Sequence, residues 1–396
     1  MAPDVARIIE LREYEPLLCS SDVISTEASE RLWLEYGAKI DVEFPSPRTG
    51  GRYRITPLGW VGQIPLSPDL HLAILPKIPL ANVFRMFEYA YRLKGFGFLD
   101  GLVGCASLAE FYENLAMVLA RRVLKRARRG LHKVYLTESE QLPFVRGRLD
   151  IGETLRLPWR TVMPCSYEEH TPDHDDNRIL LWTLDRILHS GLCSGRTQPT
   201  VRTAYLALHG AVGTHPVAAR ECIGRFYHRL NEDYEPTHAL CRFFLEQSGP
   251  THHVGDRAMV PFLVDMASLY ELFVAEWLRT HLNSRFALRT QEKVDITAEG
   301  TVRFSIDLVL YDAVTAEALC VLDTKYKAAT QPDNADIFQV NTYAAAKRCK
   351  EAVLIYPQQL GQHFDTKIGD VRIRGLVFAL DNDLEQAGQE ILASLP

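Results

Sequence analysis

The segment from Phe304 to Tyr343 most constrains what this chain can fold into. It contains two apolar runs that each carry one carboxylate, Asp307 and Asp323, and Lys325 follows the second carboxylate. Side chains alternate across a β-strand, so Asp323 and Lys325 lie on one face, about 7 Å apart along the backbone. The turn-rich residues 312–317 allow the runs to pair as a hairpin, which brings Asp307 beside Asp323. Two carboxylates and a lysine at one sheet edge predict a Mg²⁺ site for phosphodiester hydrolysis.

An Asp-x-Lys triplet alone carries little information, because residues 365–367 repeat the same three letters. No apolar run precedes that copy, and we interpret it as a solvated turn. Residues 319–322 are instead a continuous apolar run of the kind that forms a buried strand. A carboxylate at the end of such a strand needs a partner or a metal ion, since desolvating an unpaired charge is costly. Mutual neutralisation of Asp323 and Lys325 is the alternative to a metal site.

Helices are predicted on both sides of the hairpin. Residues 266–278 place apolar side chains at helical spacing, with Glu271 off the apolar stripe. Residues 335–350 form the second predicted helix, on which Gln339 and Tyr343 lie one turn apart on the same face. A further buried strand follows. The predicted order is therefore helix, three strands, helix and strand, with acidic side chains on the first helix and on two strands.

This order resembles the core of the PD-(D/E)XK nuclease superfamily, and the Gln339-x-x-x-Tyr343 pair is similar to a motif of its RecB-like branch. Three segments resemble McrC, the nuclease subunit of McrBC-type modified-cytosine restriction systems: residues 269–274, 323–327 and 336–339. Residues 61–78 are similar to the N-terminal region of the same family. One departure is that Ile306 stands where the superfamily has the proline of its name.

The resemblance implies a DNA endonuclease that depends on Mg²⁺, for which Mn²⁺ can substitute. The metal ligands that it implies are Asp307, Asp323 and the backbone carbonyl of Thr324, with Glu271 as a further candidate. The other site residues that it implies are Lys325, which orients water or stabilises developing charge, and the supporting residues Gln339 and Tyr343.

The resemblance also implies a partner. McrC proteins work with a GTP-dependent hexameric AAA+ motor of the McrB type, which recognises and translocates double-stranded DNA carrying modified cytosine. The chain would cleave the DNA and stimulate the motor. It lacks a G-x-x-x-x-G-K-[S/T] loop, so we expect it to bind no nucleotide by itself. Two other interpretations stay open: a catalytically silent adaptor that activates an AAA+ ring, and a stand-alone RecB-like exonuclease.

Length and turn signals predict an α+β multidomain protein with three domains. Residues 1–100 contain short strands separated by Pro and Gly, which predict a small β-barrel-like domain with a helix capped by Asn82. The resemblance assigns partner binding to this domain. Residues 101–250 predict a mainly helical region that includes a β-pair at 131–152. Residues 251–396 predict the α/β PD-(D/E)XK nuclease domain with a mixed sheet.

A helix predicted over residues 107–129 ends in the densest basic cluster of the chain. Its cations are Arg121, Arg122, Lys125, Arg126, Arg128 and Arg129. They suit the negative end of the helix dipole, and they equally suit contacts with DNA phosphates. With Lys327 they are the candidate DNA-binding residues. Because the formal net charge is −6, DNA contact must come from such a local patch or from the partner.

The acid-rich residues 167–176 contain His170 and His174 and permit two interpretations. One is metal binding by the histidines and nearby acids. The other, which we favour, is that Asp175 and Asp176 form the N-terminal turn of a helix over residues 177–189.

Eight cysteines are scattered along the chain without a Cys-x-x-Cys pair, which is typical of a reducing cytoplasm. No apolar run approaches the ~20 residues that span a bilayer. We therefore expect a cytoplasmic protein without membrane contact.

Overall fold

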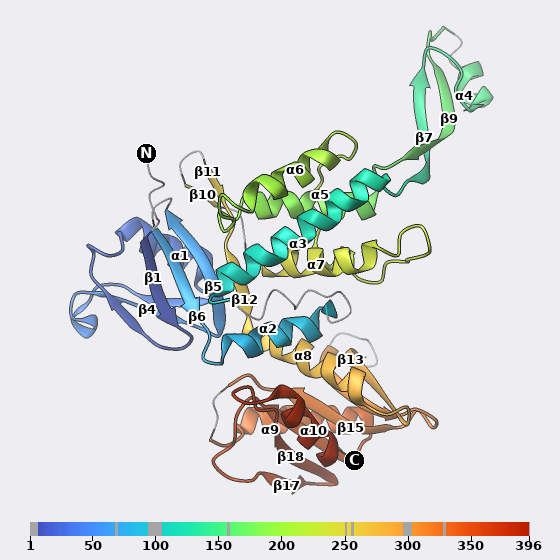
Figure 1. Cartoon of the computed structure of the whole chain (residues 1–396). Coiled ribbons are helices and arrows are strands. Elements are labelled where there is room, and N and C mark those ends of the chain that lie inside the picture. The colour runs from blue at the N-terminus through green and yellow to red at the C-terminus, as the bar shows by residue number, and fades with distance from the viewer. Residues whose placement is uncertain are drawn as a thin grey trace. The chain divides into compact units, whose positions relative to one another are not determined.

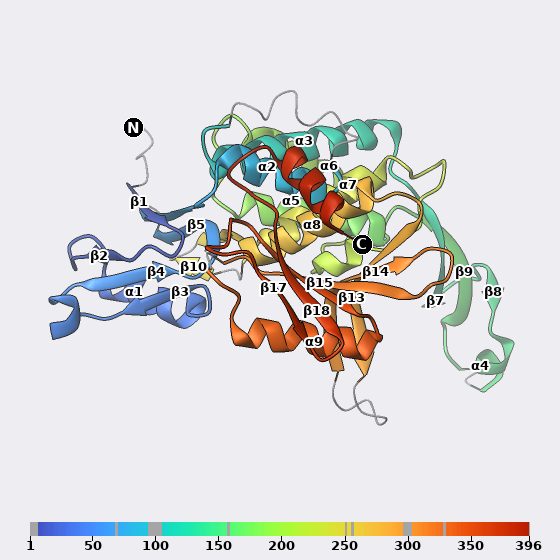
Figure 2. The same ribbon diagram turned by 90° about the horizontal axis from the view of Figure 1, so that it is seen from below.

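The computed structural model describes residues 7–67, 70–93, 105–156, 159–249, 252–254, 257–295, 303–327 and 330–395. The chain forms two compact units (Figures 1 and 2). Unit 1 comprises Met1–Phe111, His253–Arg257 and Pro261–Pro396, and unit 2 comprises Tyr112–His252 and Ala258–Val260. Both predicted domain boundaries, at 100/101 and 250/251, lie outside the described residues, so the division into three domains stays a prediction.

The N-terminal part of unit 1 contains two β-sheets over one apolar core. The first sheet has the order β2-β4-β3 (Leu17–Cys19, Tyr53–Pro57, Ile40–Glu43). The second has the order β1-β6-β5-β12 (Arg7–Arg12, Leu70–Leu75, Trp60–Ser67, Phe262–Asp265). Helix α1 (Thr26–Tyr36), which the sequence did not predict, buries Leu32 and Tyr36 in the shared core. The region is β-rich as expected, but it forms two sheets rather than one barrel.

Helix α2 (Leu80–Ala90) begins three residues earlier than a cap at Asn82 would allow. Its N-cap position is Pro79, and Asn82 is buried inside the first turn. The Asn82 amide donates to the backbone carbonyls of Leu380 and Asn382, at 2.8 and 3.0 Å. The capping prediction was therefore wrong: Asn82 satisfies distant carbonyls instead of the amides of its own helix.

Strand β12 joins the second sheet through a close approach at Gly62. Leu263 of β12 lies opposite Gly62 of β5 in an antiparallel pair. Gly62 has φ +137°, and a Cβ there would lie 2.1 Å from the carbonyl oxygen of Phe262. β12 leads directly into α8 (Met266–His281), whose first amides donate to Asp265. The pairing therefore fixes where α8 begins.

We expect Gly62→Ala to destabilise the protein by about 2 kcal/mol or more, because the new methyl group would meet backbone and the φ angle would be strained. The matched control is Gly50→Ala, since Gly50 also has a positive φ, +63°, but open space around its Cβ position. Urea unfolding should show a clearly smaller loss for Gly50→Ala. Equal losses would mean that close approach to β12 is not the constraint.

The C-terminal part of unit 1 is built on a six-stranded mixed sheet with the order β13-β14-β15-β16-β18-β17. The strands are, in chain order, Phe286–Asp295, Arg303–Asp312, Ala318–Thr324, Glu351–Tyr356, Asp365–Ile368 and Val371–Val377. β15, β16 and β18 are parallel, and the remaining neighbours are antiparallel. Helix α9 (Asn334–Lys347) covers one face, and α8 and α10 (Leu384–Ser394) cover the other (Figure 2). The predicted mixed sheet is thus present.

The second Asp-Thr-Lys triplet is not a turn. Residues Asp365–Ile368 form edge strand β17, antiparallel to β18. The Asp365 carboxylate makes a two-pronged ion pair with Arg372 on β18, with one N–O distance of 3.0 Å. The prediction failed because a cross-strand charge pair, rather than apolar burial, stabilises this strand.

Unit 2 combines helices with a three-stranded sheet (Figure 1). Its helices are α3 (Leu108–Arg129, from Tyr112 onward), α4 (Ile151–Arg156), α5 (Asp175–Leu188), α6 (Gln198–His209) and α7 (Tyr234–Gln247). The sheet order is β7-β9-β8 (Val134–Leu142, Met163–Thr171, Arg148–Leu149). The predicted β-pair at 131–152 was wrong, because β7 and β8 each pair with β9 and not with one another.

Among the described residues, no helix is both long and apolar enough to cross a membrane. The eight cysteines carry free thiols, and six of them are buried. The cytoplasmic location stays a prediction.

Candidate active site

The predicted hairpin brings two carboxylates together. β14 and β15 are antiparallel, with Leu308 opposite Leu322, and this register places Asp307 beside Asp323. The two carboxyl groups are close enough to interact, because the charge of Asp307 raises the pKa of Asp323. The backbone amide of Thr324 also donates to Asp307 Oδ2 at 3.4 Å. Asp323 is only 2% exposed, so the pair lies at the buried end of β15.

Lys325 connects this pair to helix α9. Its Nζ lies 2.7 Å from Asp323 Oδ2 and donates to Gln339 Oε1 at 2.9 Å. The Gln339 amide in turn donates to the Tyr343 hydroxyl at 2.8 Å. Four of the six predicted site residues therefore form one continuous contact network, and Asp307 lies beside it on the neighbouring strand. The Gln339 side chain thus orients the Lys325 ammonium group, and the Tyr343 hydroxyl orients Gln339.

Glu271 lies on α8 and is half-buried. Its Oε1 accepts a hydrogen bond from Gln291 of β13. Its negative charge nevertheless acts on the pair, because it helps to raise the pKa of Asp307. Glu271 thus borders the carboxylate pair, while its side chain is directed by Gln291, a residue that the sequence did not indicate.

The site concentrates negative charge in a poorly solvated place. Burial, followed by the charge of Glu271, raises the pKa of Asp307 to about 6. Burial, followed by the charge of Asp307, raises the pKa of Asp323 to about 6. Burial opposes the charged form of Lys325, but the carboxylates of Asp323, Asp336 and Asp307 together outweigh it and raise the pKa of Lys325 above its ordinary value. Lys325 therefore stays protonated. A further positive charge would stabilise the ionised forms of the two carboxyl groups beside it.

These donors suit a hard divalent cation. Asp323 Oδ2 is buried and faces Lys325 without accepting a well-aligned hydrogen bond, so one of its lone pairs is unused. Carboxylate and carbonyl oxygens are the ligands that Mg²⁺ and Mn²⁺ prefer. Asp307, Asp323 and the Thr324 carbonyl offer such oxygens at the ends of adjacent strands.

Two residues near this network were not assigned a role from the sequence. Asp336 is buried, and its Oδ1 lies 3.8 Å from Lys325 Nζ. Its position one helical turn before Gln339 was the available signal. Tyr326 donates its hydroxyl to Glu13 Oε2 at 3.2 Å, and Glu13 is fully buried. No local pattern could reveal that contact, because the two residues are 313 positions apart.

The candidate DNA-binding residues divide into two groups. Lys327 contacts Asp333 at 2.5 Å and Asp336 at 2.6 Å, so its charge is already compensated. The six cations of α3 lie in unit 2, where Arg126 pairs with Asp233 at 3.2 Å. Arg122, Lys125, Arg126 and Arg129 line a cavity of about 230 Å³. DNA binding at either place stays a prediction.

The chain is similar to known components of restriction systems. Residues 55–357 match the family described as McrBC 5-methylcytosine restriction system component. The Escherichia coli K12 protein named Type IV methyl-directed restriction enzyme EcoKMcrBC is 24% identical over 271 residues, which are 63% of this chain and 74% of that protein. The class is thus a restriction-system component. The chain belongs to the McrBC 5-methylcytosine restriction system component family.

Two solved structures are similar to this chain. One is a half-complex from a tetradecameric assembly of Thermococcus gammatolerans McrB AAA+ hexamers with bound McrC. The matching chain is 18% identical with a TM-score of 0.58, and the match covers 98% of this chain and 100% of that one. A second, the Thermococcus gammatolerans McrBC complex, has a TM-score of 0.44 at 19% identity, covering 70% of this chain and 88% of that one. The first match supports a common mixed α and β architecture.

Proposed function

We propose that this chain is the Mg²⁺-dependent DNA endonuclease subunit of a McrBC-like restriction system and that its catalytic core is of the PD-(D/E)XK type. The observation that carries the proposal is that Asp307 lies opposite Asp323 on two paired strands, with Lys325 in contact with Asp323. Family membership makes DNA the substrate that fits this chemistry. A silent adaptor would have no use for one buried and one half-buried carboxyl group with raised pKa values.

Each residue has a role in hydrolysis. Asp307, Asp323 and the Thr324 carbonyl would hold the cation, which lowers the pKa of water and neutralises charge on the phosphate. Lys325, kept charged by Asp323, would orient the attacking water or stabilise charge that develops on the phosphate oxygens. Gln339 fixes the direction of Lys325, and Tyr343 fixes that of Gln339. Glu271 adds negative charge that favours metal binding.

The proposed partner is a GTP-dependent AAA+ ring of the McrB type, which would deliver double-stranded DNA carrying modified cytosine. The structurally similar McrC chain is seen bound to McrB AAA+ hexamers, which supports this partner. In the N-terminal region, to which we assign partner binding, Trp33 and Leu34 of α1 are 54% and 73% exposed. Adjacent exposed apolar side chains are typical of interaction surfaces.

The test is a cleavage assay with the purified chain and the McrB-like protein encoded by the same host. We expect cleavage of plasmid DNA carrying modified cytosine only when the chain, the partner, GTP and Mg²⁺ are all present. Degradation from DNA ends by the chain alone would favour the exonuclease. Stimulated GTP hydrolysis without cleavage would favour the adaptor.

Trp33→Ser with Leu34→Ser should weaken co-purification with the partner.

The raised pKa values predict the pH dependence of cleavage. Because Asp307 and Asp323 keep their protons up to about pH 6, the cation must displace protons below that pH. Metal affinity should therefore fall as the pH drops through 6, by up to about tenfold per pH unit for each proton displaced. Cleavage rates at subsaturating Mg²⁺ from pH 5 to 8 would measure this. A rate that is flat across pH 6 would contradict the assignment.

A further inference from the structure

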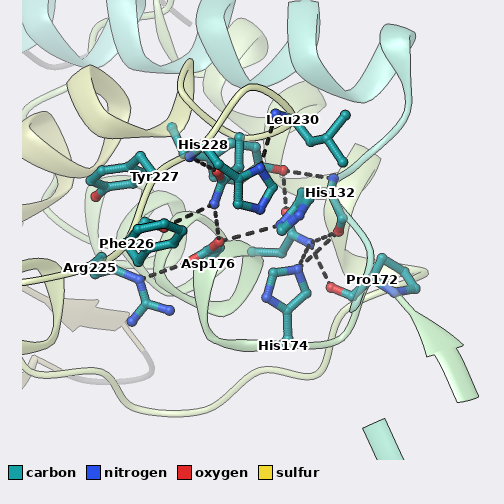
Figure 3. A network of polar contacts seen from close by, with 12 residues as sticks. His132, Pro172, His174, Asp176, Arg225, Phe226, Tyr227, His228 and Leu230 are labelled. Carbon is teal, nitrogen blue, oxygen red and sulfur yellow. Dashed lines mark hydrogen bonds and ion pairs between the residues drawn. The ribbon is translucent and has the colours of Figure 1, made fainter. Parts of the chain in front are cut away.

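A group of polar side chains in unit 2 has no part in the proposed nuclease site. His132 precedes β7, while His174 and Asp176 lie at the start of α5 (Figure 3). Each offers one ligand atom, and these atoms all lie within 4.8 Å of one another. The His132 and Asp176 side chains are 10% and 9% exposed, and His174 is 8% exposed. Three donors of the kind that bind transition metals thus converge in a buried place.

His132 and Asp176 are spaced as metal ligands rather than as hydrogen-bond partners. His132 Nδ1 lies 3.5 Å from Asp176 Oδ2, and this buried nitrogen has no hydrogen-bond partner among the described residues. Two ligands of a tetrahedral ion with bonds of about 2.05 Å are about 3.3 Å apart. The observed separation is close to that value and is long for a strong hydrogen bond.

Hydrogen bonds already orient the imidazole ring of the second ligand, His174. Both hydrogens of the Asn177 amide point to carbonyl oxygens, those of Pro172 at 2.6 Å and His132 at 2.9 Å. His174 Nε2 lies 3.0 Å from the same His132 carbonyl and 3.2 Å from the Asn177 amide nitrogen. Because a carbonyl oxygen can only accept, we assign the proton of the neutral ring to Nε2, which donates it there. Nδ1 then has the free lone pair. Metal-binding histidines are commonly oriented by such a bond from the other ring nitrogen to a carbonyl.

The carboxylate is oriented in the same way. Asp176 Oδ1 accepts from Arg225 at 2.6 Å, which leaves Oδ2 to face His132 and the more distant Asn231 amide at 3.3 Å. A fourth residue, His228, packs its ring 5.5 Å from that of His132. His228 is not a ligand, because the lone pair of its Nδ1 already accepts a hydrogen bond from the backbone amide of Leu230. The site therefore has three protein ligands and one open position.

We propose that His132, His174 and Asp176 bind one Zn²⁺ ion, which ties the residues before β7 to the start of α5. Two neutral imidazoles and one carboxylate select a borderline-soft ion such as Zn²⁺ over Mg²⁺. With three protein ligands, water would complete the tetrahedron, and the ion would cross-link the start of α5 to the residues before β7 inside unit 2. The proposal is independent of the nuclease assignment.

Zinc binding can be measured on the full chain carrying Asp323→Asn, which weakens the nuclease carboxylates as a competing site. We expect about one zinc per chain by elemental analysis after gel filtration. We also expect a Co²⁺-loaded protein with the intense visible absorption of tetrahedral coordination. Zinc should raise the unfolding temperature, as any ligand specific to the native state does. His132→Ala and His174→Ala, made in the same background, should lose all three signals.

The matched control is His170→Ala. His170 belongs to the same acid-rich segment, but its ring stacks on Tyr135 with centroids 4.6 Å apart, outside the cluster. This variant should keep full zinc binding. If His132→Ala does not fold, His132→Gln replaces it, and the Co²⁺ spectrum of the parent protein decides alone. The proposal would be overturned if the Asp323→Asn parent protein contained no zinc and gave an octahedral Co²⁺ spectrum or none. It would also be overturned if the histidine variants bound zinc as well as that parent protein does.

Discussion

Asp323→Asn should abolish DNA cleavage, with a loss of about a thousandfold or more. The substitution keeps the shape of the side chain but removes the charge that binds the cation. Metal activation of water and phosphate contributes several kcal/mol to the transition state, and each 1.36 kcal/mol is about tenfold in rate. Single-turnover cleavage with the partner, GTP and saturating Mg²⁺ would measure the loss.

The control for this substitution is Asp365→Asn. Asp365 begins the same Asp-Thr-Lys triplet, but it lies on edge strand β17 and pairs with Arg372 of β18. We expect wild-type cleavage from it.

The metal-free Asp323→Asn protein should also unfold at or above the wild-type temperature at pH 8, because the raised pKa of Asp323 means that its ionised form costs stability in the folded state. Substantial cleavage by Asp323→Asn would refute the assigned site.

Lys325→Ala should reduce cleavage by about a hundredfold to a thousandfold, the cost of removing one group that stabilises charge in a transition state. The loss should appear in the rate of the chemical step. Mg²⁺ binding should be retained or strengthened, because Asp323 loses a competing cation at 2.7 Å. Calorimetric Mg²⁺ titration beside single-turnover kinetics separates the two effects.

Lys327→Ala tests whether position matters more than charge. Lys327 is also a lysine and lies two residues away, but it contacts Asp333 and Asp336 rather than Asp323. We expect at most a small loss of cleavage. Equal losses for the two lysines would indicate a general electrostatic effect of the segment, and Lys325 would then have no special catalytic role.

Much of the geometry of the candidate site could be predicted because the site is built from neighbouring segments. A short turn after Asp312 forces β14 and β15 to pair, and strand alternation then determines which side chains share a face. Helical spacing likewise placed Gln339 and Tyr343 together. These rules operate over few residues, so they need no knowledge of the tertiary fold.

Contacts between distant segments could not be predicted in this way. β7 pairs with β9 across an interval that contains β8 and α4, and nothing in the local pattern favours that partner over residues 144–150. The cluster of His132, His174 and Asp176 depends on the same pairing, because it brings the chain before β7 next to the start of α5. His174 alone is an ordinary polar residue before a helix.

The position of β12 has a consequence for synthesis. The sheet β1-β6-β5-β12 receives its last strand from residues 262–265, although its other strands lie within residues 7–75. During translation the apolar β5 edge therefore stays unpaired until residues 262–265 have left the ribosome. Exposed edges of this kind template aggregation. A fragment that stops at residue 250 should therefore be prone to misassembly, and a chaperone that shields β5 would raise the yield of folded protein.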